Sequence, residues 1–244
     1  MLTIKNVTKK YGKVAANDNV SMTLNDGEIG IFLLDGNAYC KKLQNNKKGT
    51  FLTTLIKSAV GLLKYEGDIE VCGLPNRSIE AKRKLGYVPE IPALYDLLTV
   101  QEHLEFIRRA YKLENWEERA DMLLERFEML ENKKKLAKEL SKGMQQKLSI
   151  CCALLPDPDV VIFDEPMVGL DPHAIKVLKE TFYDLKAQNK TVIISTHMID
   201  TIADVWDTTY IMQAGRVVAE KHRNNSDGES LEDIFFRITE GSEA

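Results

Sequence analysis

The sequence predicts an α/β fold with a mainly parallel sheet and helices on both of its faces. Two short, very apolar runs carry this prediction, at residues 160–163 and 191–195. Both runs are bounded by polar or turn residues and alternate with helical patterns, as strands buried on both faces do. In addition, apolar and polar residues alternate over roughly the first thirty positions, which predicts antiparallel or mixed strands at one edge.

Composition bounds the class of protein. The chain has 244 residues, of which 44% are apolar, and this suits one globular unit or two closely joined lobes. A formal net charge of −4 argues against a nucleic-acid binder, so we expect no nucleic-acid partner. The four cysteines form no C-x-x-C pair, which favours reduced thiols over a metal site.

Neither a signal peptide nor a membrane-spanning run is expected. The amino terminus is polar and alternating, without an apolar stretch. No apolar run reaches the ~18 residues that a spanning helix needs. If the protein works at a membrane, we therefore expect another chain to supply the membrane segment.

The amino-terminal elements follow in order. The alternating strands would be joined by turns such as the one at residues 25–27, and residues 31–34 predict a buried strand. The segment TTLIKSAVGLL has helical spacing, with Leu55, Ala59 and Leu62 or Leu63 on one face. Short strands are predicted in GDIEVCGLP and KLGYVPE, the second one ending at Val88.

A helical subdomain is predicted at about residues 97–155, inserted into an α/β core at about 1–90 and 156–220. Residues 97–140 are charged and carry two apolar stripes, made of Leu104, Ile107, Arg108 and Tyr111, and of Met122, Leu123, Phe127 and Leu130. Helices are also predicted at about 141–155, 174–188, from 199, and at the carboxyl end, about 229–240. A hairpin is predicted around residues 213–216. All of these parts are assigned to a single domain, 1–244.

The strongest chemical signal is VVIFDEP, at residues 160–166. An apolar parallel strand that ends in two acids places carboxylates at the carboxyl edge of a sheet, where ligands of such sheets bind. Asp164 would hold a magnesium ion through water, and Glu165 would act as a general base on an attacking water. The plainer alternative is a strand that ends in a solvated acidic turn.

Three further motifs are weak when each is taken alone. In LSKGMQQKL, Ser141 and Gly143 at a helix start offer a hydroxyl and backbone N–H groups to a phosphate, but a simple helix cap explains them equally. The motif GLDP, with Asp171, reads as a turn. His197 in STH follows a buried strand, where a single histidine is usually structural.

The order and spacing of these four motifs closely resemble the ABC ATPase family, a branch of the P-loop NTPases, over nearly the whole chain. The resemblance implies that Ser141, Gly143 and Met144 lie in the signature motif, normally LSGGQ, which serves a partner's nucleotide. It implies that Asp164 and Glu165 form the Walker B motif, residues 169–172 the D-loop with Asp171, and His197 the switch that contacts the γ-phosphate. Tyr11 would stack on adenine, and Glu90 takes the Q-loop position, where Gln is more common.

The resemblance also implies a function. The chain would be the ATP-binding, ATP-hydrolysing subunit of an ABC transporter, using ATP and Mg²⁺ and bound to a separate transmembrane permease. A second ATPase subunit, identical or different, would face it. Its place would be cytoplasmic, on the inner face of the membrane. Glu90, LTVQEHLEF and SLEDIFFRIT resemble the branch that exports drugs, lipids or peptides.

The phosphate-binding loop departs from the family pattern, which is G-x-x-x-x-G-K followed by Ser or Thr. Between the strand at 31–34 and the helix beginning near Thr53 lies a segment about ten residues too long and poor in glycine. Counted from the strand, Gly36 and Asn37 fit the loop start, and Lys41 or Lys42 falls near the Lys position. Counted back from the helix, Thr53 and Thr54 fit the metal-binding hydroxyl and its neighbour.

That second register places Leu52 at the Lys position, which cannot bind phosphate. A third register uses Lys48. If the helix extends one turn upstream, Lys48 lies on the same face as Leu52, and the end of the helix is then displaced by about one turn, ~5 Å. The segment can also be a solvated basic loop without a phosphate role, or the product of an altered reading frame. Alternative functions therefore stay open: a nucleotide-binding or regulatory subunit with weak or no hydrolysis and, less favoured, a soluble ABC protein acting on nucleic acid or ribosomes.

Overall fold

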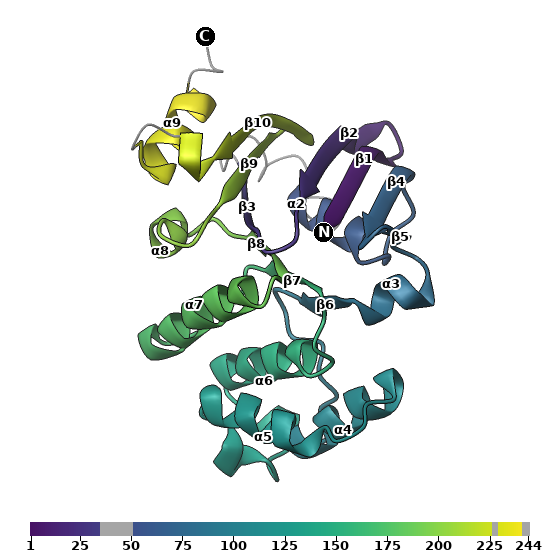
Figure 1. Ribbon diagram of the computed structural model, residues 1–244, viewed down its shortest axis with the longest axis vertical. Coiled ribbons are helices and arrows are strands. Elements are labelled where there is room, and N and C mark those ends of the chain that lie inside the picture. The colour runs from purple at the N-terminus through teal and green to yellow at the C-terminus, as the bar shows by residue number, and fades with distance from the viewer. Residues whose placement is uncertain (35–50, 226–228, 241–244) are drawn as a thin grey trace.

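Two sheets organise the chain in the computed structural model, which describes residues 1–34, 51–225 and 229–240. The larger sheet has six strands in the order β10-β9-β3-β8-β7-β6, and the smaller has four in the order β2-β1-β4-β5. Figure 1 shows the smaller sheet beside the larger one, with the helices α4, α5 and α6 gathered at the opposite end of the molecule.

The strands are β1 (Leu2–Tyr11), β2 (Val14–Leu24), β3 (Ile29–Leu34), β4 (Glu66–Val71), β5 (Leu74–Pro75), β6 (Leu85–Val88), β7 (Val160–Asp164), β8 (Thr191–Ser195), β9 (Thr208–Gln213) and β10 (Arg216–His222). The helices are α2 (Phe51–Ala59), α3 (Ile79–Arg83), α4 (Val100–Tyr111), α5 (Glu117–Arg126), α6 (Lys142–Leu154), α7 (Pro172–Ala187), α8 (Ile199–Ile202) and α9 (Leu231–Glu240). Short 3-10 turns lie at Leu130–Asn132, Ala137–Glu139 and Arg223–Asn225.

The larger sheet is buried on both faces, which explains its continuous apolar runs. Side chains alternate along β7, so that Val161 and Phe163 pack into one apolar cluster and Val160 and Ile162 into another. The first cluster is covered by α6, α7, α8 and α9, and the second by α2 and the smaller sheet. Strands β6, β7, β8, β3 and β9 are parallel neighbours, and β10 adds an antiparallel edge. The predicted α/β fold with helices on both faces is confirmed.

The predicted antiparallel edge is a separate sheet. Strand β1 pairs antiparallel with both β2 and β4. After the turn at residues 25–27 the chain leaves this sheet, and β3 inserts between β8 and β9 of the larger one. The sequence pattern predicted the strands and not this change of sheet, because a fully buried strand such as β3 has the same apolar composition wherever it pairs.

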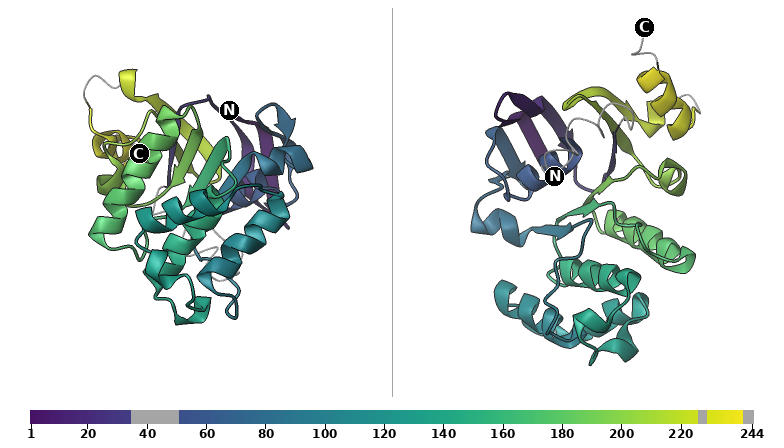
Figure 2. Two further views of the ribbon diagram at one scale, coloured as in Figure 1. Left: turned by 60° about the horizontal axis from the view of Figure 1, so that its bottom comes forward. Right: turned by 180° about the vertical axis from the view of Figure 1, so that it is seen from behind.

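Residues 97–140 contribute helices and turns, and within them one isolated bridge joins Thr99 to Leu136. Thr99 begins α4 with a capping box: its hydroxyl accepts the Glu102 N–H, and the Glu102 carboxylate accepts the Thr99 N–H. Helices α4 and α5 both pack against α6 (Figure 2). Met122 was predicted to belong to an apolar stripe, but its side chain is 63% exposed, whereas Phe127 is buried.

One other detail of the predicted elements differs. Helix α2 ends at Ala59, and Gly61 turns the chain at φ +76°, so neither Leu62, which is 65% exposed, nor Leu63 belongs to the helix. Strand β7 lies between β8 and the edge strand β6. Helix α8 begins at Ile199, as predicted, and ends at Ile202. In the described ranges no helix has both the length and the apolar character needed to cross a membrane.

Candidate functional site

Two buried acids lie where β7 ends. Asp164 pairs in register with Ser195 of the parallel strand β8, and the Ser195 hydroxyl donates a hydrogen bond to Asp164 Oδ1 at 2.6 Å. The next residue, Glu165, donates its backbone N–H to the Ser195 carbonyl at 3.0 Å. Asp164 is 3% exposed. The sheet therefore fixes one carboxylate by a short, directed hydrogen bond at its carboxyl edge.

Glu165 is held in a strained backbone conformation and contacts a histidine. Its φ of +48° lies in the left-handed region, which non-glycine residues adopt at a cost and often at functional sites. Its Oε1 accepts a hydrogen bond from His197 Nδ1 at 2.9 Å, and the His197 side chain is 70% exposed. Because Nδ1 donates to the carboxylate, Nε2 remains the ring atom that can meet a ligand.

The environment makes both carboxylates costly to ionise. Burial raises the pKa of Asp164, the charge of Glu90 adds to this, and the Ser195 hydrogen bond and the Lys57 charge oppose it. Burial also raises the pKa of Glu165, against the opposing effect of its hydrogen bond with His197. A bound cation would favour the charged form of each acid, so this edge of the sheet suits the binding of a positive ion.

These residues fit magnesium held together with a nucleotide. Glu165 Oε2 is buried and has no hydrogen-bond partner among residues 1–34, 51–225 and 229–240, which leaves an acceptor position for a ligand or water. Within the described ranges no group of three or more His, Cys, Asp or Glu residues could hold a metal ion by itself. Mg²⁺ binds commonly through one or two carboxylates together with phosphate oxygens and water, and Asp164 suits that arrangement.

Helix α2 begins at the end of the phosphate-loop segment. Thr53 and Thr54 lie in its first turn, with Thr53 partly exposed and Thr54 buried. Leu52, which one register places at the Lys position, is 3% exposed and packs into the apolar cluster between the two sheets. Gly36, Asn37 and Lys48, and with them Lys41 and Lys42, lie outside the described residues.

The predicted adenine contact lies in the smaller sheet. Tyr11 is the last residue of β1, half-buried, and the Lys9 ammonium lies 5.0 Å from the centroid of its ring. Glu90 follows β6 and is exposed, and its charge acts on both Asp164 and Tyr87. The structure therefore places Glu90 beside the acids of β7.

The signature and D-loop residues form a second group. Ser141 caps α6, and its hydroxyl accepts the Met144 N–H at 3.3 Å. Asp171 caps α7 in the same way, accepting the Ala174 N–H at 2.9 Å. The two motifs approach each other closely at Gly143, where an added Cβ would come within 2.7 Å of the Gly169 carbonyl oxygen.

Three residues that act on Asp164 were not predicted. Ser195 donates to Asp164, the Tyr87 hydroxyl also hydrogen-bonds Asp164, and Lys57 supplies positive charge. Lys57 lies four residues after Thr53, a helical spacing that places both on one face of α2. Ser195 could have been found by aligning the carboxyl ends of the two apolar strands, whereas Tyr87 required the strand order.

Comparison with known proteins agrees with this geometry. The family model described as ABC transporter matches residues 49–168. The chain is 32% identical to the ABC-type transporter ATP-binding protein EcsA of Bacillus subtilis, over 98% of this chain and 96% of that protein. It is 34% identical to the Nod factor export ATP-binding protein I of Burkholderia orbicola, over 90% of this chain and 70% of the relative.

A solved structure described as the ATP binding subunit of an ABC transporter superposes with a TM-score of 0.87. It is 30% identical to this chain and covers 98% of it, and the match covers 99% of that structure. The fold and the site thus define a nucleotide-binding ATPase of the P-loop class. The chain belongs to the ATP-binding subunits of ABC transporters.

Proposed function

We propose that this chain binds ATP and Mg²⁺ at the carboxyl edge of β7 and couples hydrolysis to substrate movement by a separate membrane permease. The observation that carries the proposal is the contact between Glu165 Oε1 and His197 Nδ1 at 2.9 Å, next to the buried Oε2, which no described residue hydrogen-bonds. One carboxylate oxygen is oriented by the histidine, and the other is available to accept a proton from water.

Each residue has a distinct task in hydrolysis. Glu165, whose pKa is raised by burial, polarises the attacking water as a general base. His197 orients Glu165 through Nδ1 and can donate to a γ-phosphate oxygen through Nε2. Tyr11 stacks on the adenine ring. The hydrogen bond between Glu165 and His197 supports the first two assignments, and the resemblance to the family supports that of Tyr11.

Asp164, through water, and the Thr53 hydroxyl are the groups that would hold Mg²⁺. The ion, when bound, neutralises negative charge on the phosphate oxygens. Ser195 and Tyr87 keep the Asp164 carboxylate in one orientation by hydrogen bonding. Glu90 lies near enough to Asp164 to affect its pKa, so a change at the Q-loop position reaches the metal-binding residue electrostatically.

In this proposal the permease binds at a groove beside the site. It has a volume of about 590 Å³, lies between β6 and α4 and is lined by Tyr87, Pro89 and Phe106 among others. Ile91 and Leu97 nearby are 78% and 73% exposed, an apolar surface that a partner could cover. We place the chain on the cytoplasmic face of the membrane through this contact. An export direction is supported by the relative named for Nod factor export.

A second ATPase subunit completes the proposed assembly. Ser141, Gly143 and Met144 would face the nucleotide of that subunit, since α6 presents its N-terminus and the Ser141 side chain is at the surface. A homodimer would carry the altered phosphate loop in both sites. A heterodimer would keep one site built from an intact partner loop and this chain's signature.

The alternative function is a nucleotide-binding or regulatory subunit with weak or no hydrolysis. The burial of Leu52 among apolar side chains favours it, because the register that places Thr53 on the metal then has no cation at the Lys position. The retention of Asp164, Glu165 and His197, all of which act on the chain's own nucleotide, favours hydrolysis.

Steady-state ATPase assays of the purified chain, with and without the permease, separate the two functions. We expect hydrolysis that the permease stimulates and that Glu165→Gln abolishes; absence of hydrolysis in both states would overturn the first function. A fluorescent ATP analogue titrated into the parent, and into a variant with residues 40–52 replaced by a glycine-rich loop ending in Lys, tests the loop. Weak binding that the replacement restores is expected, and equally tight binding by the parent would show that its own loop holds phosphate.

A further inference from the structure

The start of α6 is attached to residues 166–171, which we call the linking segment because it joins Glu165 to α7. Gln146, which is 2% exposed, donates from Nε2 to the Pro166 carbonyl at 3.4 Å. Farther along, the Gly143 backbone meets the Gly169 carbonyl so closely that any Cβ would clash with it. The two helices α6 and α7 lie side by side in both views (Figures 1 and 2).

A buried ammonium group makes the third contact. The Lys147 side chain is only 10% exposed, and its Nζ lies 3.4 Å from Glu128 Oε2 and 3.6 Å from Asp171 Oδ2. A cation removed from water is costly unless anions surround it, so this lysine stabilises one arrangement of both carboxylates. Its two partners come from two other elements, Glu128 from the end of α5 and Asp171 from the start of α7.

Asp171 has a double role in this cluster. Its Oδ1 accepts the Ala174 N–H at 2.9 Å and thereby begins α7, while Oδ2 faces Lys147. The pKa of Asp171 is lowered, first by that backbone hydrogen bond and further by the Lys147 charge. Glu128, at the end of α5, has a φ of +57°, and its Oε1 lies 3.5 Å from His173 Nε2. The cluster therefore joins α5, α6 and α7.

We propose that Lys147 is a positioning residue that fixes the linking segment to α6, a proposal that rests on the proposed function. One end of this unit carries Ser141, which would face a partner's nucleotide, and the other carries Glu165, which acts on the chain's own. Because Lys147, Gln146 and Gly143 connect them, a displacement of α6 moves the backbone directly after Glu165. Lys147 itself touches no nucleotide in this scheme.

Hydrogen exchange tests the attachment independently of hydrolysis. The Leu170 amide donates to the Met167 carbonyl within the linking segment, and the Val168 amide donates to the carbonyl of Glu165 directly before it. In Lys147→Met, which keeps length and apolar packing, we expect their exchange to be about tenfold faster, since local opening becomes easier. Glu128→Gln removes charge from the exposed side of the cluster and should give about a threefold increase. Lys134→Met, at an exposed lysine, is the matched control.

Kinetics test the positioning role. For Lys147→Met we expect kcat to fall about tenfold while KM changes less than about twofold, since an interaction that matters for the reacting geometry is lost and nucleotide binding is not. Lys147→Arg should stay within about threefold of the parent rate. Melting temperatures show that each variant is folded.

Unchanged exchange at Val168 and Leu170 in Lys147→Met would overturn the proposal. A parent-like kcat would do so too, as would a rise in KM alone or an equal loss in the Arg variant. If the parent chain hydrolyses no ATP, the proposed function fails, and the exchange result then decides on the attachment by itself.

Discussion

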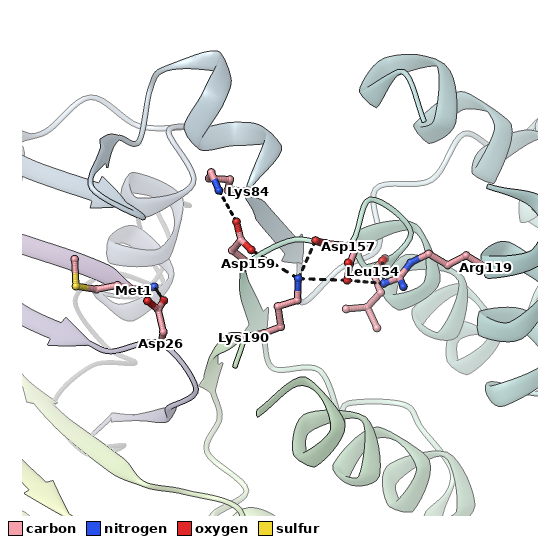
Figure 3. A network of polar contacts seen from close by, with 8 residues as sticks. All are labelled: Met1, Asp26, Lys84, Arg119, Leu154, Asp157, Asp159 and Lys190. Atoms are coloured by element: carbon pink, nitrogen blue, oxygen red, sulfur yellow. Dashed lines mark hydrogen bonds and ion pairs between the residues drawn. The ribbon is translucent and has the colours of Figure 1, made fainter. Parts of the chain in front are cut away.

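The two ends of β7 carry acids in opposite circumstances. At the amino end, Asp157 and Asp159 are neutralised by cations from three parts of the chain (Figure 3). Lys84 lies 2.7 Å from Asp159, and Arg119 lies 3.0 Å from Asp157. Lys190 pairs with both acids, at 3.4 and 3.7 Å. The pKa of Asp159 is accordingly lowered, chiefly by its hydrogen bond with Lys84.

At the carboxyl end, only a few residues along the same strand, burial raises the pKa of Asp164 and of Glu165. In the part of the chain that the structure describes, Glu165 Oε2 has no hydrogen-bond partner. The two ends show that one strand can separate a structural network from a binding site. Acids at the amino end are paired with cations and hold elements together, whereas those at the carboxyl end lie where burial disfavours their charge, a cost that a nucleotide with its metal ion can offset.

Replacing the proposed base is the sharpest test of this comparison. Glu165→Gln keeps the shape of the side chain and removes its ability to take a proton. We expect hydrolysis to fall by about 10²–10⁴-fold while ATP binding is retained, so that nucleotide becomes trapped. Single-turnover rates and filter binding measure the two effects separately. Turnover at the parent rate would show that Glu165 is another structural acid.

At the amino end the expected effect is on stability alone. Arg119 of α5 donates to the Leu154 and Leu155 carbonyls at the end of α6, in addition to its pair with Asp157. Arg119→Ala should lower the free energy of unfolding by about 1–2 kcal/mol, because charged hydrogen bonds to backbone carbonyls are lost from a partly exposed site. Chemical denaturation measures this change. ATPase activity should stay at the parent level, and its loss would mean that the two ends are not independent.

Removing the Asp164 charge at the carboxyl end of β7 should raise the free energy of unfolding, whereas Arg119→Ala should lower it. Asp164→Asn keeps an oxygen to accept the Ser195 hydroxyl and eliminates an ionised group that burial disfavours. We expect the free energy of unfolding at pH 7 to be about 1 kcal/mol higher in this variant. Magnesium-dependent nucleotide binding should be lost. Because the pKa of Asp164 is raised in the folded chain, its ionisation costs the parent no stability below the ordinary Asp pKa. This loss of stability develops as the pH rises through the pKa of the folded chain. A destabilised variant at pH 7 would show that the parent carboxylate is already well satisfied.

Much of this arrangement could be predicted from periodicity. The apolar runs of β7 and β8, and the apolar stripe of α4 with Leu104 and Ile107, are local patterns that packing reinforces. Strand order is not local: nothing in residues 29–34 indicates that β3 lies between β8 and β9, since any fully buried strand has that composition. The same limit applies to the site. Asp164, Glu165 and His197 lie in local motifs and were indicated by the sequence, whereas Tyr87 and Lys57 became evident only as folded neighbours of Asp164.

The smallest expected effect concerns the pair of Lys84 and Asp159, whose side chains are 43% and 42% exposed. Lys84→Met should cost about 0.2–1 kcal/mol at pH 7, the range for solvent-screened pairs. The pKa of Asp159 is lowered in the folded chain, so its stabilising contribution is present above the ordinary Asp value of ~3.9 and disappears as pH falls through the folded value. Denaturation of parent and variant, compared at pH 7 and at about pH 3, should therefore show a difference that shrinks in acid. A difference of the same size at both pH values would assign the effect to the packing of the Lys84 stem, and the amino end of β7 would then owe less to its charges than the geometry indicates.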